Sequence, residues 1–276
     1  MSQPNSTAFD LDRIGGRRAL SDLISEVLAA GEEALQQFRA GAARNYLTKP
    51  DHSPVTAADR LVESRLRGFI ERRFPPIGFL GEESGQTDKT PSGMRFIVDP
   101  IDGTRAFIRG LSGWAVLVGL EAQDEPVLGI AFMPASDLLY VAVKGEGAQA
   151  NGRPLRVSAI DSVDTALISH GGLQQFTNAG VEHLLPEIAR CSYSQRGFAD
   201  FGGYGTVLEG KADAMVDPDV KPWDLCAPAI LIREAGGAFT SFEGEHTIYG
   251  GSALASNGLI HGQLLEMIRK ANRETP

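Results

Sequence analysis

Two carboxylates stand close together after a short apolar segment, 96–98, near the middle of the chain. Asp99 and Asp102 follow this segment and precede Gly103 and Thr104. Unpaired carboxylates held at one place repel each other and are costly to desolvate, and a divalent cation between them relieves both effects. The pair therefore predicts a metal site, although an ordinary turn with Thr104 as a helix cap explains the same residues.

The segments on either side of this pair must position it. Residues 96–98 are typical of a buried strand, and Pro100 has no N–H to continue a ladder. We therefore expect the chain to turn as Asp99 leaves the sheet. Gly103 and Thr104 precede a segment that can begin a helix, where free backbone N–H groups attract an anion such as phosphate.

Further acidic residues occupy comparable places in the chain. Glu82 and Glu83 follow an apolar strand predicted over 77–80, so they leave a sheet as Asp99 does. Asp224 stands at the expected start of a helix. Taken alone, each has a simpler explanation, because loop glutamates are usually solvated and an aspartate at this place is typically an N-cap.

Composition bounds the class of protein. The chain has 276 residues, of which 42% are apolar, enough for one large domain or two modest ones. Its 35 acidic and 26 basic residues give a charge of -9, which argues against a nucleic-acid partner. An acidic protein that binds an anionic substrate needs local positive charge, which a bound metal would supply. Cys191 and Cys226 are too few for a disulfide framework, and no segment resembles a secretory signal or a membrane span. We expect a cytoplasmic protein with a disordered tail over residues 1–8.

Apolar periodicity predicts two helices in the first part of the chain. One covers roughly 10–40, and the second ends near Phe74 before two prolines. The polar segment 47–59 between them is expected to be a loop. Thr56 followed three residues later by Asp59 resembles a capping box at the start of the second helix.

The remainder of the chain is predicted to form two kinds of layer. Three apolar, β-rich segments predict an antiparallel meander: 114–120, 127–133 and 138–143. Asn151-Gly152 indicates a two-residue hairpin, and we place a boundary after it, between an α+β half, 9–155, and an α/β half, 156–276. The second half alternates strands and helices: strands 166–169 and 212–216, and helices 182–189, 203–208 and one from Asp224 that ends at Gly236-Gly237.

Four motifs in chain order resemble the inositol monophosphatase superfamily from about residue 15 to residue 270. They are Lys49-x-Asp51-x-Ser53-Pro54-Val55-Thr56-x-x-Asp59, Gly81-Glu82-Glu83, Asp99-Pro100-Ile101-Asp102-Gly103-Thr104, and Trp223-Asp224 with Glu234-Ala235-Gly236-Gly237. The resemblance implies an α/β fold, a layered αβαβα sandwich with an α+β N-terminal half. It further implies a homodimeric phosphomonoesterase that acts on a small phosphorylated metabolite and uses two to three Mg²⁺ ions in each active site.

The resemblance also implies a role for each matching residue. The first metal is held by Glu82, Asp99 and the main-chain oxygen of Ile101, and the second by Asp99, Asp102 and Asp224, with a third, weaker ion near Glu82. Catalysis is assigned to Asp59, Thr104 and Glu82, of which Asp59 and Thr104 orient and deprotonate the attacking water. The N–H groups of Gly103 and Thr104 hold phosphate. Lys49 and Asp51 are expected to support the metal ligands without binding the metal themselves. A ligand set made only of oxygen atoms favours Mg²⁺ over zinc.

Local sequence indicates which ester is cleaved. The segments 53–56, 102–110 and 197–204 look like those of the histidinol-phosphatase branch, with Asp200 and Tyr204 in its Gly-Asp-x-x-x-Tyr pattern and Ala199 in place of the glycine. An aspartate facing the substrate suits the cationic amine of L-histidinol phosphate. Asp217 is either a second partner for the amine or a solvated residue at a strand end.

The predicted activity is Mg²⁺-dependent hydrolysis of L-histidinol phosphate to L-histidinol and phosphate, a step of histidine biosynthesis. The alternative is an inositol-1-phosphate or broad-specificity sugar-phosphate and fructose-1,6-bisphosphate phosphatase. A calcium-sensor module is disfavoured because the acidic motif lacks EF-hand ligand spacing. Histidines are not assigned to the site and are expected mostly at the surface: His52, His170, His183, His246 and His261.

Overall fold

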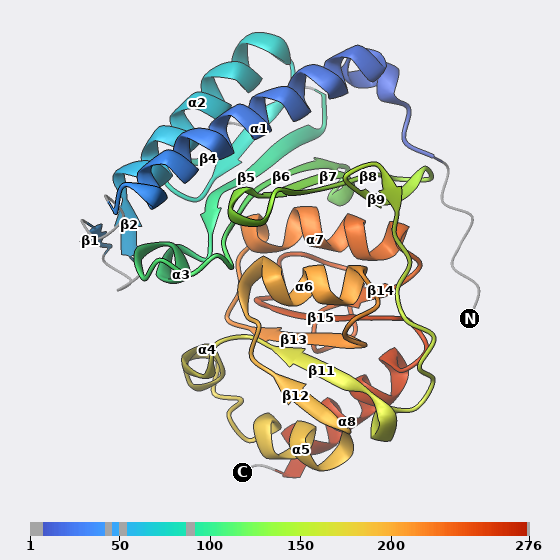
Figure 1. Cartoon of the computed structure of the whole chain (residues 1–276). Helices are drawn as coiled ribbons and strands as arrows, with labels where there is room; N and C mark the ends of the chain where they lie inside the picture. The colour runs from blue at the N-terminus through green and yellow to red at the C-terminus, as the bar shows by residue number, and fades with distance from the viewer. Residues whose placement is uncertain (1–7, 42–45, 50–53, 87–91, 275–276) are drawn as a thin grey trace.

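The computed structural model describes residues 8–41, 46–49, 54–86 and 92–274. Most of the tail predicted to be disordered lies outside these residues, as do Asp51, His52 and Ser53. The described residues form five layers in the order helix, sheet, helix, sheet, helix (Figure 1). This arrangement confirms the predicted α/β fold and its αβαβα sandwich.

The outer helices α1 (Gly16–Arg39) and α2 (Ala57–Arg73) cover one face of an eight-stranded sheet. Along the sheet, its strands run in the order β10 (Arg153–Pro154), β9 (Gly147–Ala150), β8 (Leu138–Val143), β7 (Glu125–Met133), β6 (Ala115–Ala122), β5 (Met94–Asp102), β3 (Gly78–Gly81) and β4 (Gly85–Gln86). Phe96 and Val98 of β5 pack into the core under α1 and α2, and Ile97 packs on the opposite face. The alternation is that of a strand buried on both sides.

The middle layer is formed by α6 (Asp200–Leu208) and α7 (Pro222–Glu234), which pack between the two sheets. The second sheet has the order β12 (Ser194–Arg196), β11 (Leu167–His170), β13 (Ala214–Pro218), β15 (Ser252–Ser256) and β14 (Ala238–Thr240). Its outer face is covered by α5 (Leu184–Cys191) and α8 (His261–Glu274). The short helices α3 (Thr104–Ile108) and α4 (Leu173–Asn178) lie at one end of the layers (Figure 1). Because α6 and α7 share one core with the first sheet, the predicted halves are not packed independently.

Helix starts differ from the sequence prediction for identifiable reasons. The helix predicted from residue 10 is split at Gly15, whose φ of 92° separates a short 3₁₀ helix, Leu11–Ile14, from α1. The helix predicted from Gly203 begins at Asp200. The helix predicted from Asp224 begins at Pro222, because proline is well suited to the first helical position.

Asp224 is therefore not an N-cap, and that interpretation is wrong. Its carboxylate lies in the first turn of α7 and accepts a hydrogen bond of 2.7 Å from the N–H of Lys221. Pro228 lies buried inside the helix. Gly236, with φ of 89°, follows the helix as a left-handed cap, as predicted.

Strand β5 runs through Pro100 to Asp102, so the prediction that the chain leaves the sheet at Asp99 is wrong. Asp99 pairs with Leu117 and Asp102 with Ala115, so β5 has one residue more than β6 between these pairs. This bulge accommodates a proline without an N–H. In a regular strand, residues three apart face opposite sides of the sheet, and the extra residue brings Asp99 and Asp102 to the same side.

The predicted loop over 47–59 contains a short antiparallel pair, β1 (Tyr46–Thr48) and β2 (Pro54–Thr56), so that prediction is wrong for its ends. The capping box of Thr56 and Asp59 at the start of α2 is confirmed. The antiparallel meander and the hairpin at Asn151 and Gly152 are confirmed as well. In the second half, the predicted strands 166–169 and 212–216 and the predicted helix 182–189 lie within two residues of β11, β13 and α5. The elements β12, β14, β15, α4 and α8 were not predicted.

The described part of the chain contains no helix long and apolar enough to cross a membrane. One histidine departs from the predicted surface location. His261 is buried at the start of α8, where its ring nitrogens lie 2.9 Å from Ser256 Oγ and 3.0 Å from Thr240 Oγ1.

Candidate active site

Three acidic side chains meet where β5 ends and α7 begins. Asp99, Asp102 and Asp224 each offer one carboxylate oxygen, and these oxygens all lie within 4.8 Å of one another. They line a cleft of about 620 Å³. The same cleft is lined by other residues predicted for the site: Glu82, Ile101, Gly103, Thr104, Asp200 and Asp217.

The electrostatics of the three carboxylates fit a cation site. Burial, followed by the charge of Glu82, raises the pKa of Asp99 well above its usual range. Burial and the charge of Asp200 do the same for the pKa of Asp102, and burial raises the pKa of Asp224 to about 6. Buried carboxylates that repel one another are stabilised in their charged form by a divalent cation. The donor set contains only oxygen, which Mg²⁺ and Ca²⁺ prefer.

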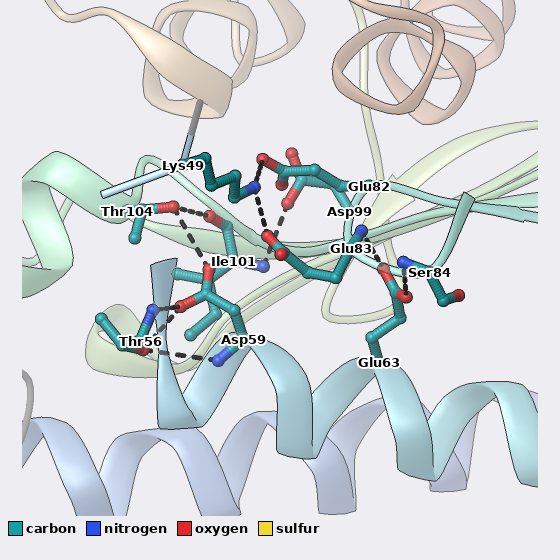
Figure 2. Close-up of polar contacts among 10 residues, drawn as sticks. All are labelled: Lys49, Thr56, Asp59, Glu63, Glu82, Glu83, Ser84, Asp99, Ile101 and Thr104. Atoms are coloured by element: carbon teal, nitrogen blue, oxygen red, sulfur yellow. Dashed lines mark hydrogen bonds and ion pairs between the residues drawn. The ribbon is translucent and has the colours of Figure 1, made fainter. Parts of the chain in front are cut away.

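Glu82 lies beside this group and not within it. Because β3 and β5 are parallel, both end at the same edge of the sheet, and the N–H of Glu82 donates to the carbonyl of Val98 at 3.2 Å. The Oε1 atom of Glu82 binds Lys49 Nζ at 2.7 Å (Figure 2). Burial raises the pKa of Glu82 to about 7, although Lys49 lowers it.

Lys49 also contacts Glu83, so it bridges both glutamates that follow β3 (Figure 2). Burial alone would lower the pKa of Lys49, but the hydrogen bonds to Glu82 and Glu83 and their charges raise it overall. The side chains of Glu82 and Glu83 are only 16% and 12% exposed. The interpretation of these two as solvated loop charges is therefore wrong.

The turn that carries Glu82 and Glu83 is held by Glu63, a residue that the sequence reasoning missed. Its carboxylate accepts the N–H groups of Glu83 at 2.8 Å and Ser84 at 2.7 Å (Figure 2). A Cβ on Gly81 would lie 2.6 Å from the carboxyl carbon of Glu63, so the glycine makes this approach possible. The available signal was a glutamate directly after Val62, within the apolar face of α2.

The side chains of Asp59 and Thr104 point toward each other (Figure 2), and Thr104 lines the cleft. Asp59 Oδ2 accepts the N–H of Thr56 at 2.8 Å and its hydroxyl at 2.5 Å. The Thr104 hydroxyl lies 3.3 Å from Asp59 Oδ1 and 3.0 Å from the carbonyl oxygen of Ile101. Burial raises the pKa of Asp59 although these hydrogen bonds lower it. The buried carboxylate can therefore accept a proton from Thr104.

Gly103 and Asp200 meet on the other side of the acidic group. Gly103 has φ of 82° and caps α3, where the first backbone N–H groups have no acceptor within the helix. A Cβ on Gly103 would lie 3.0 Å from Asp200 Oδ2. Asp102 accepts the N–H of Phe201 at 2.6 Å, which ties α6 to the acidic group. Burial and the charge of Asp224 raise the pKa of Asp200 to about 6.

Asp217 is 2% exposed, so the interpretation as a solvated residue at a strand end is wrong. Its oxygens accept the Tyr204 hydroxyl at 2.9 Å and the Gln175 side-chain amide at 3.3 Å. A Cβ on Gly171 would lie 2.2 Å from Asp217 Oδ1, so only glycine fits there. Gln175 was not identified from the sequence, because its approach depends on the placement of α4.

Residues 19–275 match the description of the inositol monophosphatase family. The chain belongs to this family. As a member of the inositol monophosphatase family it is a phosphoric monoester hydrolase, an enzyme for small phosphorylated substrates. The predicted family and enzyme class are thereby confirmed.

Relatives within the family carry two kinds of name. The histidinol-phosphatase of Mycobacterium tuberculosis is 39% identical over 249 residues, which cover 88% of this chain and 95% of the relative. The inositol-1-monophosphatase of Rhizobium meliloti is 34% identical over 261 residues, which cover 92% and 94%. The solved structure of the extragenic suppressor protein suhB from Bartonella henselae has a TM-score of 0.83 at 29% identity, covering 91% of this chain and 99% of that one.

Proposed function

We propose that this phosphatase hydrolyses L-histidinol phosphate to L-histidinol and phosphate in a Mg²⁺-dependent reaction. The observation that carries the proposal is Asp200, a half-buried carboxylate that lines the cleft beside Gly103. A substrate with a cationic amine next to its phosphate ester gives this carboxylate a charged partner, whereas a polyol does not. The 39% identity to a histidinol-phosphatase supports the same substrate. Inositol-1-phosphate is the second candidate, favoured by the 34% identity to an inositol-1-monophosphatase.

The carboxylates of Asp99, Asp102 and Asp224 would hold Mg²⁺, with Glu82 and the carbonyl of Ile101 as further ligands. When bound there, Mg²⁺ supplies positive charge that offsets the charge of the phosphate and of the leaving oxygen. Lys49 neutralises part of the same acidic region through Glu82 and Glu83. A cytoplasmic location and a homodimeric state stay predictions from the sequence.

Groups around the phosphate bind it and transfer the proton of the attacking water. The N–H groups at Gly103 and Thr104 bind phosphate oxygens at the start of α3. The Thr104 hydroxyl accepts the proton of the attacking water as it passes its own proton to Asp59 Oδ1, 3.3 Å away. Thr56 holds Asp59 in place for this transfer. Asp217 fixes the hydroxyl of Tyr204 and, because both of its oxygens already accept hydrogen bonds, binds the substrate less directly than Asp200.

Substitution of Asp200 tests this proposal. Asp200→Asn keeps the shape of the side chain and removes its charge, and a charge-assisted hydrogen bond is worth about 1.5–3 kcal/mol. We expect kcat/KM for L-histidinol phosphate to fall about 10- to 100-fold, and kcat/KM for 4-nitrophenyl phosphate to fall much less. Asp219→Asn is the matched control, because Asp219 lines the same cleft and its carboxylate is held by Asn178. An equal loss on both substrates in the Asp200 variant would contradict the assignment.

A further inference from the structure

Two large apolar side chains are exposed on the lining of the cleft, which also contains the acidic group and the basic residues Arg105 and Arg109. Leu111 is 61% exposed in the loop after α3, and Phe198 is 48% exposed in the loop before α6. They come from segments that pack against different sheets. Apolar surface left open in a binding cleft indicates that part of the ligand is apolar.

The loops that carry these side chains meet at Gly103. A Cβ on Gly103 would lie 3.0 Å from Asp200 Oδ2 and 3.2 Å from the carbonyl oxygen of Gly113. Phe198 precedes Asp200 by two residues, and Leu111 precedes Gly113 by two. Both apolar residues therefore stand two positions in the chain from a residue that borders Gly103, and both line the same cleft as Gly103 and Asp200.

The backbone around Phe198 is fixed in an unfavourable conformation. Ala199 has φ of 51° and ψ of 171°, and Asp200 has φ of 45°, so two successive residues other than glycine adopt positive φ. The loop rests on His170, whose carbonyl accepts the N–H of Ala199 at 3.3 Å. A Cβ on Gly197 would lie 3.0 Å from the His170 ring, so ring and loop are in close contact. Such strain persists at functional sites where the surrounding structure enforces it.

We propose that Phe198 is a specificity residue that stacks on a planar ring of the leaving alcohol, with Leu111 as a second apolar contact. The substrate class is then a phosphate monoester of an amino alcohol that carries a flat heteroaromatic ring, such as imidazole. This inference rests on the proposed function and extends it, because Asp200 recognises the amine and Phe198 the ring. Inositol has no aromatic face and gains no stacking contact from Phe198.

The experiment compares two esters that share the amine and differ in the ring. They are L-histidinol phosphate and 2-aminopropyl phosphate, both assayed by phosphate release with saturating Mg²⁺. Phe198→Leu keeps an apolar side chain and removes the ring, and Phe198→Tyr keeps the ring. Stacking acts equally in the ground state and the transition state, so we expect Phe198→Leu to raise the KM for L-histidinol phosphate about 5- to 10-fold more than the KM for 2-aminopropyl phosphate. We expect Phe198→Tyr to have the wild-type ratio of the two KM values.

The outcomes separate this inference from the proposal on which it rests. Suppose that the wild-type enzyme prefers L-histidinol phosphate to 2-aminopropyl phosphate and that Phe198→Leu retains this preference in full. The stacking assignment is then wrong, and the proposed substrate stands. If the wild-type enzyme shows no preference for the ester with the ring, the proposed substrate and the stacking contact both fail. Leu259→Ala is the matched control, because Leu259 is 56% exposed and does not line the cleft. We expect no change in the KM ratio for this variant.

Discussion

Removal of the charge of Asp224 should stabilise the metal-free enzyme and weaken the stabilisation by Mg²⁺. Burial raises the pKa of this carboxyl from 3.8 to about 6, so the folded protein loses stability as the pH rises from 3.8 through 6, and the loss is complete at pH 7. A shift of about 2 units corresponds to about 3 kcal/mol. Asp224 is partly exposed, and solvent screens its charge, so we expect Asp224→Asn to gain about 1–2 kcal/mol.

The substitution keeps the size of the side chain, and an asparagine amide can still donate to Asp99, with which Asp224 shares a hydrogen bond. An asparagine oxygen can still accept the N–H of Lys221, which lies 2.7 Å from the carboxylate. Urea unfolding at pH 7.5, followed by circular dichroism, measures the free energy of unfolding first with EDTA and then with Mg²⁺. The wild-type protein gains stability from Mg²⁺ by mass action, and the variant gains much less. The order of stability of the two proteins is therefore expected to reverse between the two buffers.

Asp213→Asn serves as the opposite control. Asp213 is buried and accepts hydrogen bonds from the N–H of Leu167 at 2.7 Å and from Ser158 Oγ at 2.5 Å. Its replacement disturbs these bonds and should lower stability in both buffers. The reasoning on Asp224 is refuted if its variant is less stable than the wild-type protein in EDTA, or if both gain equally from Mg²⁺.

Three further predictions follow from individual contacts. Thr104→Val should lower kcat about 10²- to 10⁴-fold, because it removes the hydroxyl that links water to Asp59. A kcat near the wild-type value in steady-state kinetics would argue against this relay. Ala199→Gly should raise the free energy of unfolding by about 1 kcal/mol, because glycine adopts the positive φ without strain; a lower urea midpoint would contradict this. Burial, followed by the charge of His246, lowers the pKa of His261 from 6.5 to about 4. Because the unfolded protein then binds a proton more readily than the folded protein, the free energy of unfolding falls by up to about 3 kcal/mol as the pH falls from 6.5 through 4. His261→Gln should make stability less dependent on pH over that range, and identical profiles for the two proteins would exclude the histidine as a cause.

Local patterns in the sequence predicted the first two helices and the acidic group, whereas the layered arrangement was implied by the family resemblance. Apolar periodicity identified α1 and α2, and the parallel arrangement of β3 and β5 explains why Glu82 and Asp99 reach one edge of the sheet. The common orientation of Asp99 and Asp102 was predicted from a turn, but its cause is a bulge around Pro100. A bulge depends on how β5 pairs with β6, which one strand's sequence does not reveal.

Contacts between residues far apart in the chain could not be predicted from the sequence. Glu63 supports the turn at Glu83 from a helix twenty residues earlier in the chain. Gln175 of α4 reaches Asp217 of β13, and these partners depend on tertiary packing with no local signature. Ala199 marked a departure from the family pattern in the sequence, and the structure gives it a physical meaning, because alanine stands there at positive φ.

The central claim is that the cleft is built for L-histidinol phosphate. The most direct test is the ratio of kcat/KM for L-histidinol phosphate to kcat/KM for inositol-1-phosphate, measured on the purified full-length enzyme with Mg²⁺. The carboxylate of Asp200 beside Gly103 predicts a ratio of at least about 10 to 100, the value of one charge-assisted contact. A ratio near one, or a preference for inositol-1-phosphate, would contradict the proposed substrate.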